Sequence, residues 1–174
     1  MDAQASFGIS VLFGFTVWGI IGAREIWPRL RDRSRADALR PLLLLHSFRF
    51  VGLAFLVPGV VSPALPDAFA RPAAYGDLIT AILALLALAT VHTRIGTTLV
   101  WLFSVLGTTD LLNAYYQGAR AGLGLEPGLQ GATFFIPTVL VPLMLVTHVL
   151  VFRVLLQNRR SSAAIRTPMT PPAP

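Results

Sequence analysis

The chain has 174 residues, of which 55% are hydrophobic and 13% charged, and its net charge is +6 at pH 7. A water-soluble domain of this length needs more polar surface to cover its core, so we expect one integral membrane domain in contact with the lipid bilayer. All fourteen basic residues are arginine, and most of them stand in short breaks between apolar runs. Basic residues at such positions are typical of the loops that flank membrane spans, and this argues against nucleic-acid binding. The absence of cysteine excludes disulfides, thiolate metal sites and cysteine nucleophiles.

Five apolar stretches predict five membrane-spanning helices, because a bilayer core of about 30 Å needs roughly 20 apolar residues per helix. The expected spans are 6–23, 41–57, 74–90, 96–117 and 132–157. The predicted fold is all-α, an integral membrane bundle over residues 1–160, followed by a proline-rich tail over 161–174 that we expect to be disordered. Since the chain starts Met1-Asp2, without the basic start of a signal peptide, the first span should be retained.

The first span is rich in small residues. Glycines stand at positions 8, 14, 19 and 22, and Ser10 and Gly14 form a small-xxx-small pair. Small residues at such spacing let helix backbones approach closely in lipid. We therefore expect a packing face here, through which a partner membrane protein or a second copy of the chain could dock.

Residues 24–40 form the strongest orientation signal. Pro28 is expected to interrupt any helix there, and the second span should begin at Pro41, a favourable first helical position. The breaks on the same side of the membrane as residues 24–40 hold eleven arginines, and the breaks on the opposite side hold two. The positive-inside rule then predicts an outside N-terminus and a cytoplasmic C-terminus. The arginine- and alanine-rich composition is typical of GC-rich bacteria, so we expect a bacterial inner membrane protein.

Two breaks should lie on the outer side. The segment 58–73 holds four prolines and is expected to follow the interface, with a short helical turn near 67–71. The segment 118–131 is expected to be a glycine-rich loop. Pro137 and Pro142 fall inside the fifth span, where prolines kink membrane helices.

Four stretches of the second to fifth spans suggest a family: HSFRFVGLAFLVPG, LPDAFARPAAYGDLITAILALLAL, LFSVLGTTDLLNA and FIPTVLVPLMLVTHVLVFR. They resemble a group of small bacterial multi-spanning membrane proteins, mostly uncharacterised, with an FRxxG helix, a PxxFAxPAxxGD junction, an LLD-like segment and a PxxLVPLxLxxH helix. Here the third motif reads TDLLN. The resemblance implies a helical membrane fold with Arg49, Asp77, Asp110 and His148 as its most recognisable polar positions, and it supplies no reaction, substrate or cofactor.

Ionisable residues inside a membrane are costly unless paired, so they are candidate functional residues. At a level nearer the cytoplasm we expect His46, Arg49 and His148, with His46 and Arg49 on one helix face. The two histidines could hydrogen-bond across helices, which we favour, handle protons or a ligand, or ligate a haem iron or metal. Because no acidic residue is predicted at this level, we expect no metal site. Arg49 should find an internal partner, or else an anionic ligand.

A second, outer level is predicted to hold Asp77, Asp110 and Asn113, with Gln117 continuing the polar stripe of the fourth span. Asp77 is expected in the first turn of its helix, where a negative charge complements the helix dipole. Asp110 lies toward the C-terminal end of its helix and needs a partner. The options are Arg71, Arg120 or a protonated state.

No phosphate-binding glycine loop, HExxH or GxSxG motif is present, which favours a non-enzymatic role. Three hypotheses follow. In the first, the intramembrane polar residues bind or translocate a small solute, a lipid or a proton. In the second, the protein is an accessory or structural subunit of a larger membrane complex. In the third, His46 and His148 bind haem b in a redox protein, which is the only hypothesis that needs a cofactor.

Overall fold

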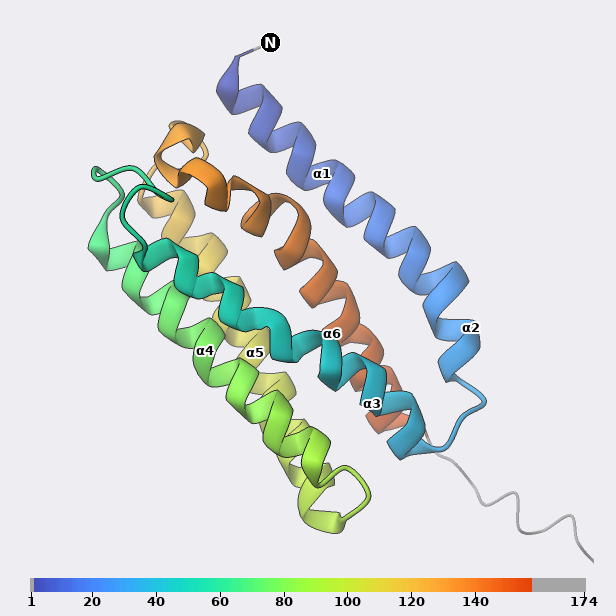
Figure 1. Ribbon diagram of the computed structural model, residues 1–174. Coiled ribbons are helices and arrows are strands. Elements are labelled where there is room, and N and C mark those ends of the chain that lie inside the picture. Colours follow the sequence, from blue (N-terminus) through green and yellow to red (C-terminus); the bar gives the residue numbers. More distant parts are fainter. Residues whose placement is uncertain (1, 158–174) are drawn as a thin grey trace, which may run out of the picture.

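The computed structural model describes residues 2–157, and the expected tail over 161–174 lies outside them. Among the described residues there is no β-strand, and five helical spans are long and apolar enough to cross a membrane. Figure 1 shows them side by side in one elongated bundle. The spans are Ala3–Leu30, Arg35–Leu56, Asp67–Ala89, Arg94–Arg120 and Ile136–Leu156. The predicted all-α fold with five spans is confirmed.

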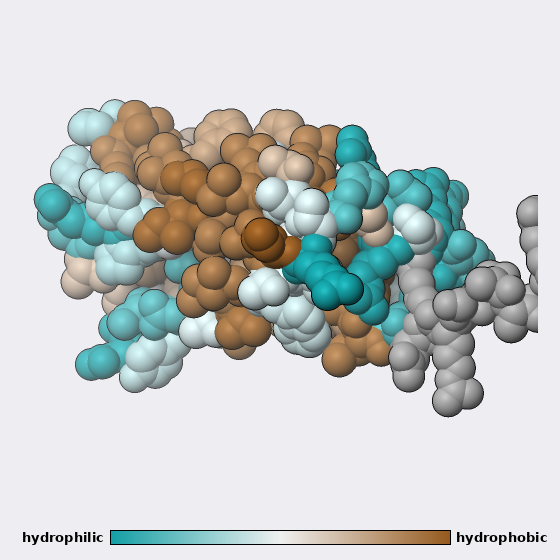
Figure 2. Space-filling view, turned by 90° about the horizontal axis from the view of Figure 1, so that it is seen from below, coloured by the Kyte–Doolittle hydropathy of each residue, from teal (hydrophilic) through white to brown (hydrophobic). Residues whose placement is uncertain are grey.

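The exterior of the bundle is apolar. Large hydrophobic side chains are exposed on every span, among them Leu12, Phe50, Ile79, Leu102 and Val149. Figure 2 shows this surface across the middle of the molecule, with hydrophilic residues gathered to the left and right of the view. Monomeric water-soluble proteins do not expose apolar surfaces this extensive. Such a surface matches the hydrocarbon core of a bilayer. The protein is therefore a multi-pass membrane protein.

The first span runs further than predicted. Helix α1 (Ala3–Ile21) continues through a π-helical turn, η1 (Gly22–Ile26), into α2 (Trp27–Leu30). Pro28 does not interrupt it, so that prediction is wrong. The π turn lets the Trp27 amide bond to the Gly22 carbonyl, and the Arg29 guanidinium donates to the Glu25 carbonyl. Such local adjustments re-satisfy the backbone around a proline in a membrane helix.

The second span begins six residues before Pro41. Helix α3 covers Arg35–His46, and Ser34 caps it by accepting the Asp37 amide at 3.2 Å. Serine at this position stabilises a helix start, which outweighs the preference of Pro41 for a first helical position. A 3₁₀ segment, η2 (Ser47–Leu56), completes the span.

The third span also begins earlier than predicted. The turn expected near 67–71 is the start of α4 (Asp67–Ala89), and Pro72 lies inside the helix. Asp67 stands in the first turn and pairs with Arg71 at 3.0 Å, an i,i+4 pair that favours a helix start here. Asp77 therefore lies well inside α4, and the predicted role in complementing the helix dipole is wrong.

The fourth and fifth spans are close to prediction. Helix α5 covers Arg94–Arg120, and the fifth span combines a π-helical segment, η4 (Ile136–Leu140), with α6 (Val141–Leu156). Before it, η3 (Pro127–Phe134) consists of two short 3₁₀ turns joined by a kink at Gly131, and its first part lies in the predicted loop. It is tied to the 58–66 break because the Val60 carbonyl accepts the Ala132 amide at 2.9 Å.

The four later spans enclose the core, and α1 lies outside them against α6 and η4. None of the α1 residues is buried. Gly14 of α1 and Gly22 of η1 bring the backbone of the first span against Pro142 and Val146, whereas nothing lies within 4 Å of a Cβ placed on Gly8 or Gly19. The small-residue packing face is thus used within the chain, and docking of another protein on α1 stays a prediction.

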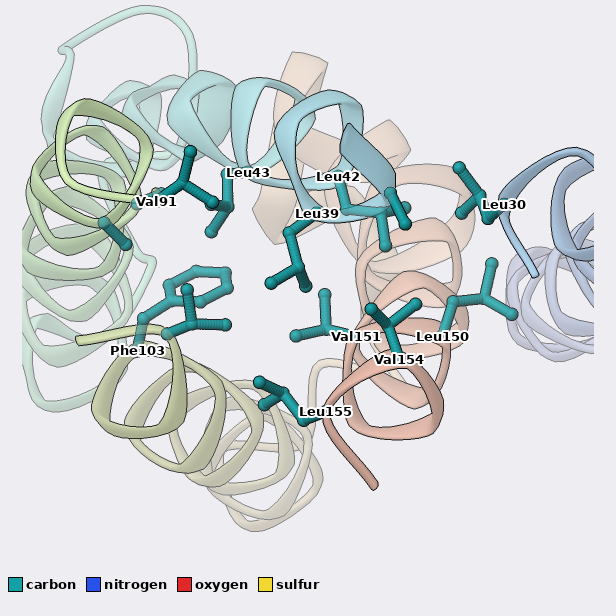
Figure 3. Packing of buried hydrophobic residues seen from close by; sticks show 14 residues of the cluster. Leu30, Leu39, Leu42, Leu43, Val91, Phe103, Leu150, Val151, Val154 and Leu155 are labelled. Carbon is teal, nitrogen blue, oxygen red and sulfur yellow. The ribbon is translucent and has the colours of Figure 1, made fainter. Parts of the chain in front are cut away.

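Two apolar clusters fill the core, one toward each end of the bundle. The large apolar cluster lies toward the arginine-rich end, and Figure 3 shows its side chains converging between the helices; it includes Leu39, Leu43, Phe103, Val151 and Val154. The second apolar cluster includes Phe55, Phe69, Leu111, Ile136 and Met144. On each of the four spans, buried polar residues stand in the sequence between members of the two clusters.

Candidate functional site

A buried ion-pair cluster lies between the two apolar clusters. Arg49 donates through Nε to Asp77 Oδ1 at 2.7 Å and through Nη2 to Asp110 Oδ2 at 2.5 Å. Its Nη1 donates to the Gly107 carbonyl at 3.1 Å. Arg49, Asp77 and Asp110, which we call the charge cluster, thus connect η2, α4 and α5. Each charged side chain has a partner inside the protein, which is what burial in lipid requires.

The 3₁₀ winding of η2 aligns the residues that face this cluster. Within η2 the buried residues are Arg49, Gly52 and Phe55, each three positions from the next, and His46 precedes them by three. A 3₁₀ helix has three residues per turn, so this spacing forms a straight row. In an α-helix each step of three would rotate by about 60° and turn the row away from α4. The tight winding therefore lets His46 and Arg49 both face the core.

Three glycines make room for the charged side chains. A Cβ on Gly52 would overlap the Asp77 carboxylate, and one on Gly76 would overlap that of Asp110. A Cβ on Gly107 would lie 2.7 Å from His148 Nε2 and 2.9 Å from Arg49 Nη1. These glycines explain the FRxxG and GD motifs in physical terms: each lets a neighbouring helix place a carboxylate or guanidinium against its backbone.

The two histidines meet beside the charge cluster. Their ring centroids are 4.2 Å apart, and each ring lies 5.0 Å from that of Phe103. His46 Nε2 and Thr147 Oγ1 are hydrogen-bonded at 3.0 Å, a bond across helices as favoured from the sequence. The Thr147 hydroxyl also lies within hydrogen-bond distance of the Leu143 and Met144 carbonyls of its own helix. Both ring nitrogens of His148 are buried and find no hydrogen-bond partner among residues 2–157.

As placed, the histidine pair does not fit a haem iron. Metal–nitrogen bonds of about 2 Å on opposite sides of one ion would separate the ring centres by roughly 6 Å. The observed separation is 4.2 Å, and Phe103 packs against both rings. The arrangement is that of a packed aromatic cluster, and haem binding would require the two helices to move apart.

A cavity leads to the two carboxylates. It has a volume of about 160 Å³, and its lining is mostly apolar. Asp77 and Asp110 form its polar end, and it extends along α5 to Gly118. Gln130 also lines it, with a buried Nε2 that has no hydrogen-bond partner in the described part of the chain. Other lining residues are Phe7, Phe69, Ala114, Tyr115 and Leu123.

A second cavity reaches the charge cluster from the side of η2 and α6. Its volume is about 290 Å³, and it is lined by Phe48, Arg49, Gly52, Asp77, Leu140 and Met144 among others. The two cavities share Asp77 and three apolar residues, so they meet the charge cluster from two directions. Toward the arginine-rich end, by contrast, the large apolar cluster fills the space between the helices.

A family model for a domain of unknown function, DUF8737, matches residues 6–156, most of the chain. The chain belongs to the DUF8737 family. No curated protein and no solved structure matches it. The match covers all five spans except the first residues of α1, and it contains the whole charge cluster and both histidines. The resemblance noted in the sequence to an uncharacterised membrane family agrees with this assignment.

In this DUF8737 protein the two predicted levels form one site. Arg49, which the sequence predicted at the level of the histidines, pairs with Asp77 and Asp110, which were predicted at the outer level. The partner of Asp110 is therefore Arg49. The two arginines weighed as its partners were wrong, because Arg71 pairs with Asp67 and the Arg120 guanidinium lies over the Tyr116 ring. The expectation that no acidic residue lies near Arg49 was also wrong.

Asn113 is not brought to the site, since its side chain is exposed on α5. Sequence reasoning missed Thr147, Gln130 and Gly107. Thr147 directly precedes His148 in the matching helix motif, and Gly107 lies three residues before Asp110, so their positions beside recognised residues were a usable signal. Gln130 stands in a predicted loop, and no pattern in the sequence pointed to its burial.

Proposed function

We propose that this protein binds a small, largely apolar molecule within the membrane and holds its polar group against Asp77 and Asp110. The observation that carries the proposal is the apolar cavity ending on these two carboxylates. Apolar walls with a few placed polar groups are the usual form of a small-molecule site. An apolar cavity of about 150 Å³ is large enough for benzene, so the enclosed part of the ligand is of similar size.

The ligand enters from the membrane in this proposal. The second cavity reaches the charge cluster between η2 and α6 through residues that are nearly all apolar. A molecule with an apolar body, dissolved in lipid, can follow such a path, whereas a hydrated solute without an apolar body would lose its water without compensation.

Binding is supported better than passage across the membrane. The large apolar cluster closes the bundle on the arginine-rich side, where Leu39, Leu43 and Phe103 are buried side by side. A translocated molecule would have to separate these side chains. We therefore assign the site to binding and release on the cavity side of the charge cluster.

The membrane and orientation are part of the proposal. We place the protein in a bacterial inner membrane with the arginine-rich end in the cytoplasm, so the cavity lies in the outer half of the bilayer. The support is the excess of arginine at one end of the bundle. A protease-sensitive tag before Met1 should be cleaved in intact spheroplasts, and protection of the tag would contradict this orientation.

Photolabelling tests the binding function. A neutral eight-carbon alcohol with a chain diazirine, added to the protein in zwitterionic nanodiscs, should label α4 and α5 around the cavity, as located by mass spectrometry. Gly118→Leu should reduce this labelling by about tenfold or more, because the new side chain fills the cavity. A Cβ at Gly118 meets only ordinary contacts, the nearest being Phe69 at 3.4 Å, so the fold should tolerate the change.

Gly19→Leu is the matched control, since nothing lies within 4 Å of its Cβ position and Gly19 does not line the cavity. It should label like the unaltered protein. Labelling spread evenly over lipid-facing residues, or equal labelling of the Gly118→Leu protein, would contradict the proposed function.

A further inference from the structure

We propose that the bound molecule is an organic monocation, such as a protonated amine on a short apolar body. This deepens the proposed function and rests on it. The starting point is the charge balance of the site, where one guanidinium faces two carboxylates. With both carboxylates ionised, the charge cluster has one negative charge in excess, which a cationic group in the cavity would neutralise.

No other cation of the described chain reaches the excess charge. Arg71 and Arg120 are the arginines nearest in sequence to the cavity residues of α4 and α5. Arg71 pairs with Asp67, and the Arg120 guanidinium lies 5.8 Å from the Tyr116 ring centre. Both are on the outside of the bundle. Since neither arginine reaches Asp110, a positive group would approach this carboxylate through the cavity that it lines.

The polar end of the cavity offers only acceptors. The Arg49 side chain is 1% exposed and its donors are directed at Asp77, Asp110 and the Gly107 carbonyl. The side chains of Asp77 and Asp110 are 12% and 20% exposed and line the cavity. Ionised carboxylates accept hydrogen bonds and cannot donate them. An ammonium group is therefore complementary to this end, and a phosphate or carboxylate is repelled by it.

Gln130 adds a second contact on the wall. Its Nε2 is buried, lacks a partner within the described structure and belongs to a side chain that lines the cavity. An unmatched amide donor in an apolar wall costs free energy, which an acceptor on the ligand would recover. A ligand that fits both the carboxylates and the Gln130 amide is an amine that also has a hydroxyl, ether or carbonyl oxygen.

The test compares three photoreactive probes with the same eight-carbon diazirine chain and an amine, an alcohol or a carboxylate at the end. Labelling of cavity residues in zwitterionic nanodiscs should rank amine, alcohol, carboxylate, with the amine favoured over the alcohol by about tenfold. Labelling of the Gly118→Leu protein is subtracted as background for each probe. This ranking needs no variant of the charge cluster.

Asp110→Asn, which keeps the shape and removes the excess charge, should abolish the preference for the amine while the alcohol still labels the cavity. Glu126→Gln, which removes an exposed carboxylate near the same end of the bundle, should leave the preference unchanged. Equal labelling by amine and alcohol, or a preference for the carboxylate, would overturn the inference and leave the proposed function standing. Failure of all three probes to label the cavity would instead overturn the proposed function and the inference with it.

Discussion

The charge cluster and the large apolar cluster are neighbouring buried regions that are stabilised by different forces. Leu39, Leu43 and Phe103 fill their region by shape and leave no polar group to satisfy. Arg49, Asp77 and Asp110 are held by mutual pairing and leave cavities on two sides. In the proposed function, the region closed by apolar packing blocks passage, and the region held by charge pairing offers acceptors to the ligand. The comparison therefore separates residues expected to serve stability alone from residues expected to serve stability and binding.

The largest effect is expected for Arg49→Met. Removing one partner of a buried ion pair costs about 3–5 kcal/mol, and here two carboxylates lose their partner together. We expect the free energy of unfolding, measured by SDS titration in mixed micelles, to fall by at least this amount. Arg71→Met, which removes an exposed ion pair with Asp67, should change it by less than about 1 kcal/mol. An equal loss in both variants would show that the charge cluster is not the stronger interaction.

A smaller loss of stability without loss of binding is expected for Leu43→Ala. Truncation of a fully buried leucine costs about 2–5 kcal/mol through lost contacts and a residual cavity. The same SDS titration should show it, while the tenfold preference for the amine probe stays intact in the folded fraction. Loss of that preference would mean that the apolar cluster and the charge cluster do not act separately.

The smallest effect is expected for Thr147→Val. The change keeps the side-chain shape and removes the hydroxyl that is hydrogen-bonded to His46 Nε2, which should lower the free energy of unfolding by about 1 kcal/mol. Thr138→Val is the matched control, because within the described structure that hydroxyl bonds to the Phe134 carbonyl of the same span and to no other helix. If the two variants unfold alike, the bond between the helices contributes nothing measurable.

Several features of the fold could be predicted because they depend on composition over a long window. The five spans follow from runs of apolar residues, and the second and third differ from prediction mainly at their starts. Ser34 and the Asp67–Arg71 pair extend α3 and α4 beyond the prolines that seemed to limit them in the sequence. A cap or an ion pair of a few residues is a local signal, and the apolar pattern alone does not reveal it.

The charged residues and the two histidines of the site were predicted from the sequence, whereas Thr147, Gln130 and Gly107 and the contacts among the members were not. Depth counted from the helix ends separated Arg49 from Asp77 and Asp110, but the arginine side chain is long enough to span the two expected levels. The 3₁₀ winding of η2 then directs it toward α4. Neither the reach of one side chain nor a change from 3.6 to 3.0 residues per turn is visible in the spacing of apolar residues.

The amino-acid sequence by itself determined that this chain is a bundle of membrane-spanning helices with Arg49, Asp77, Asp110 and the two histidines inside it, because the free energy of placing apolar segments in lipid depends on composition. Only the tertiary structure decided that one arginine serves two aspartates and that a cavity ends on them. Those features depend on which helices pack together and how closely Gly52, Gly76 and Gly107 let them approach, and such distances between helices are not a property of any single segment.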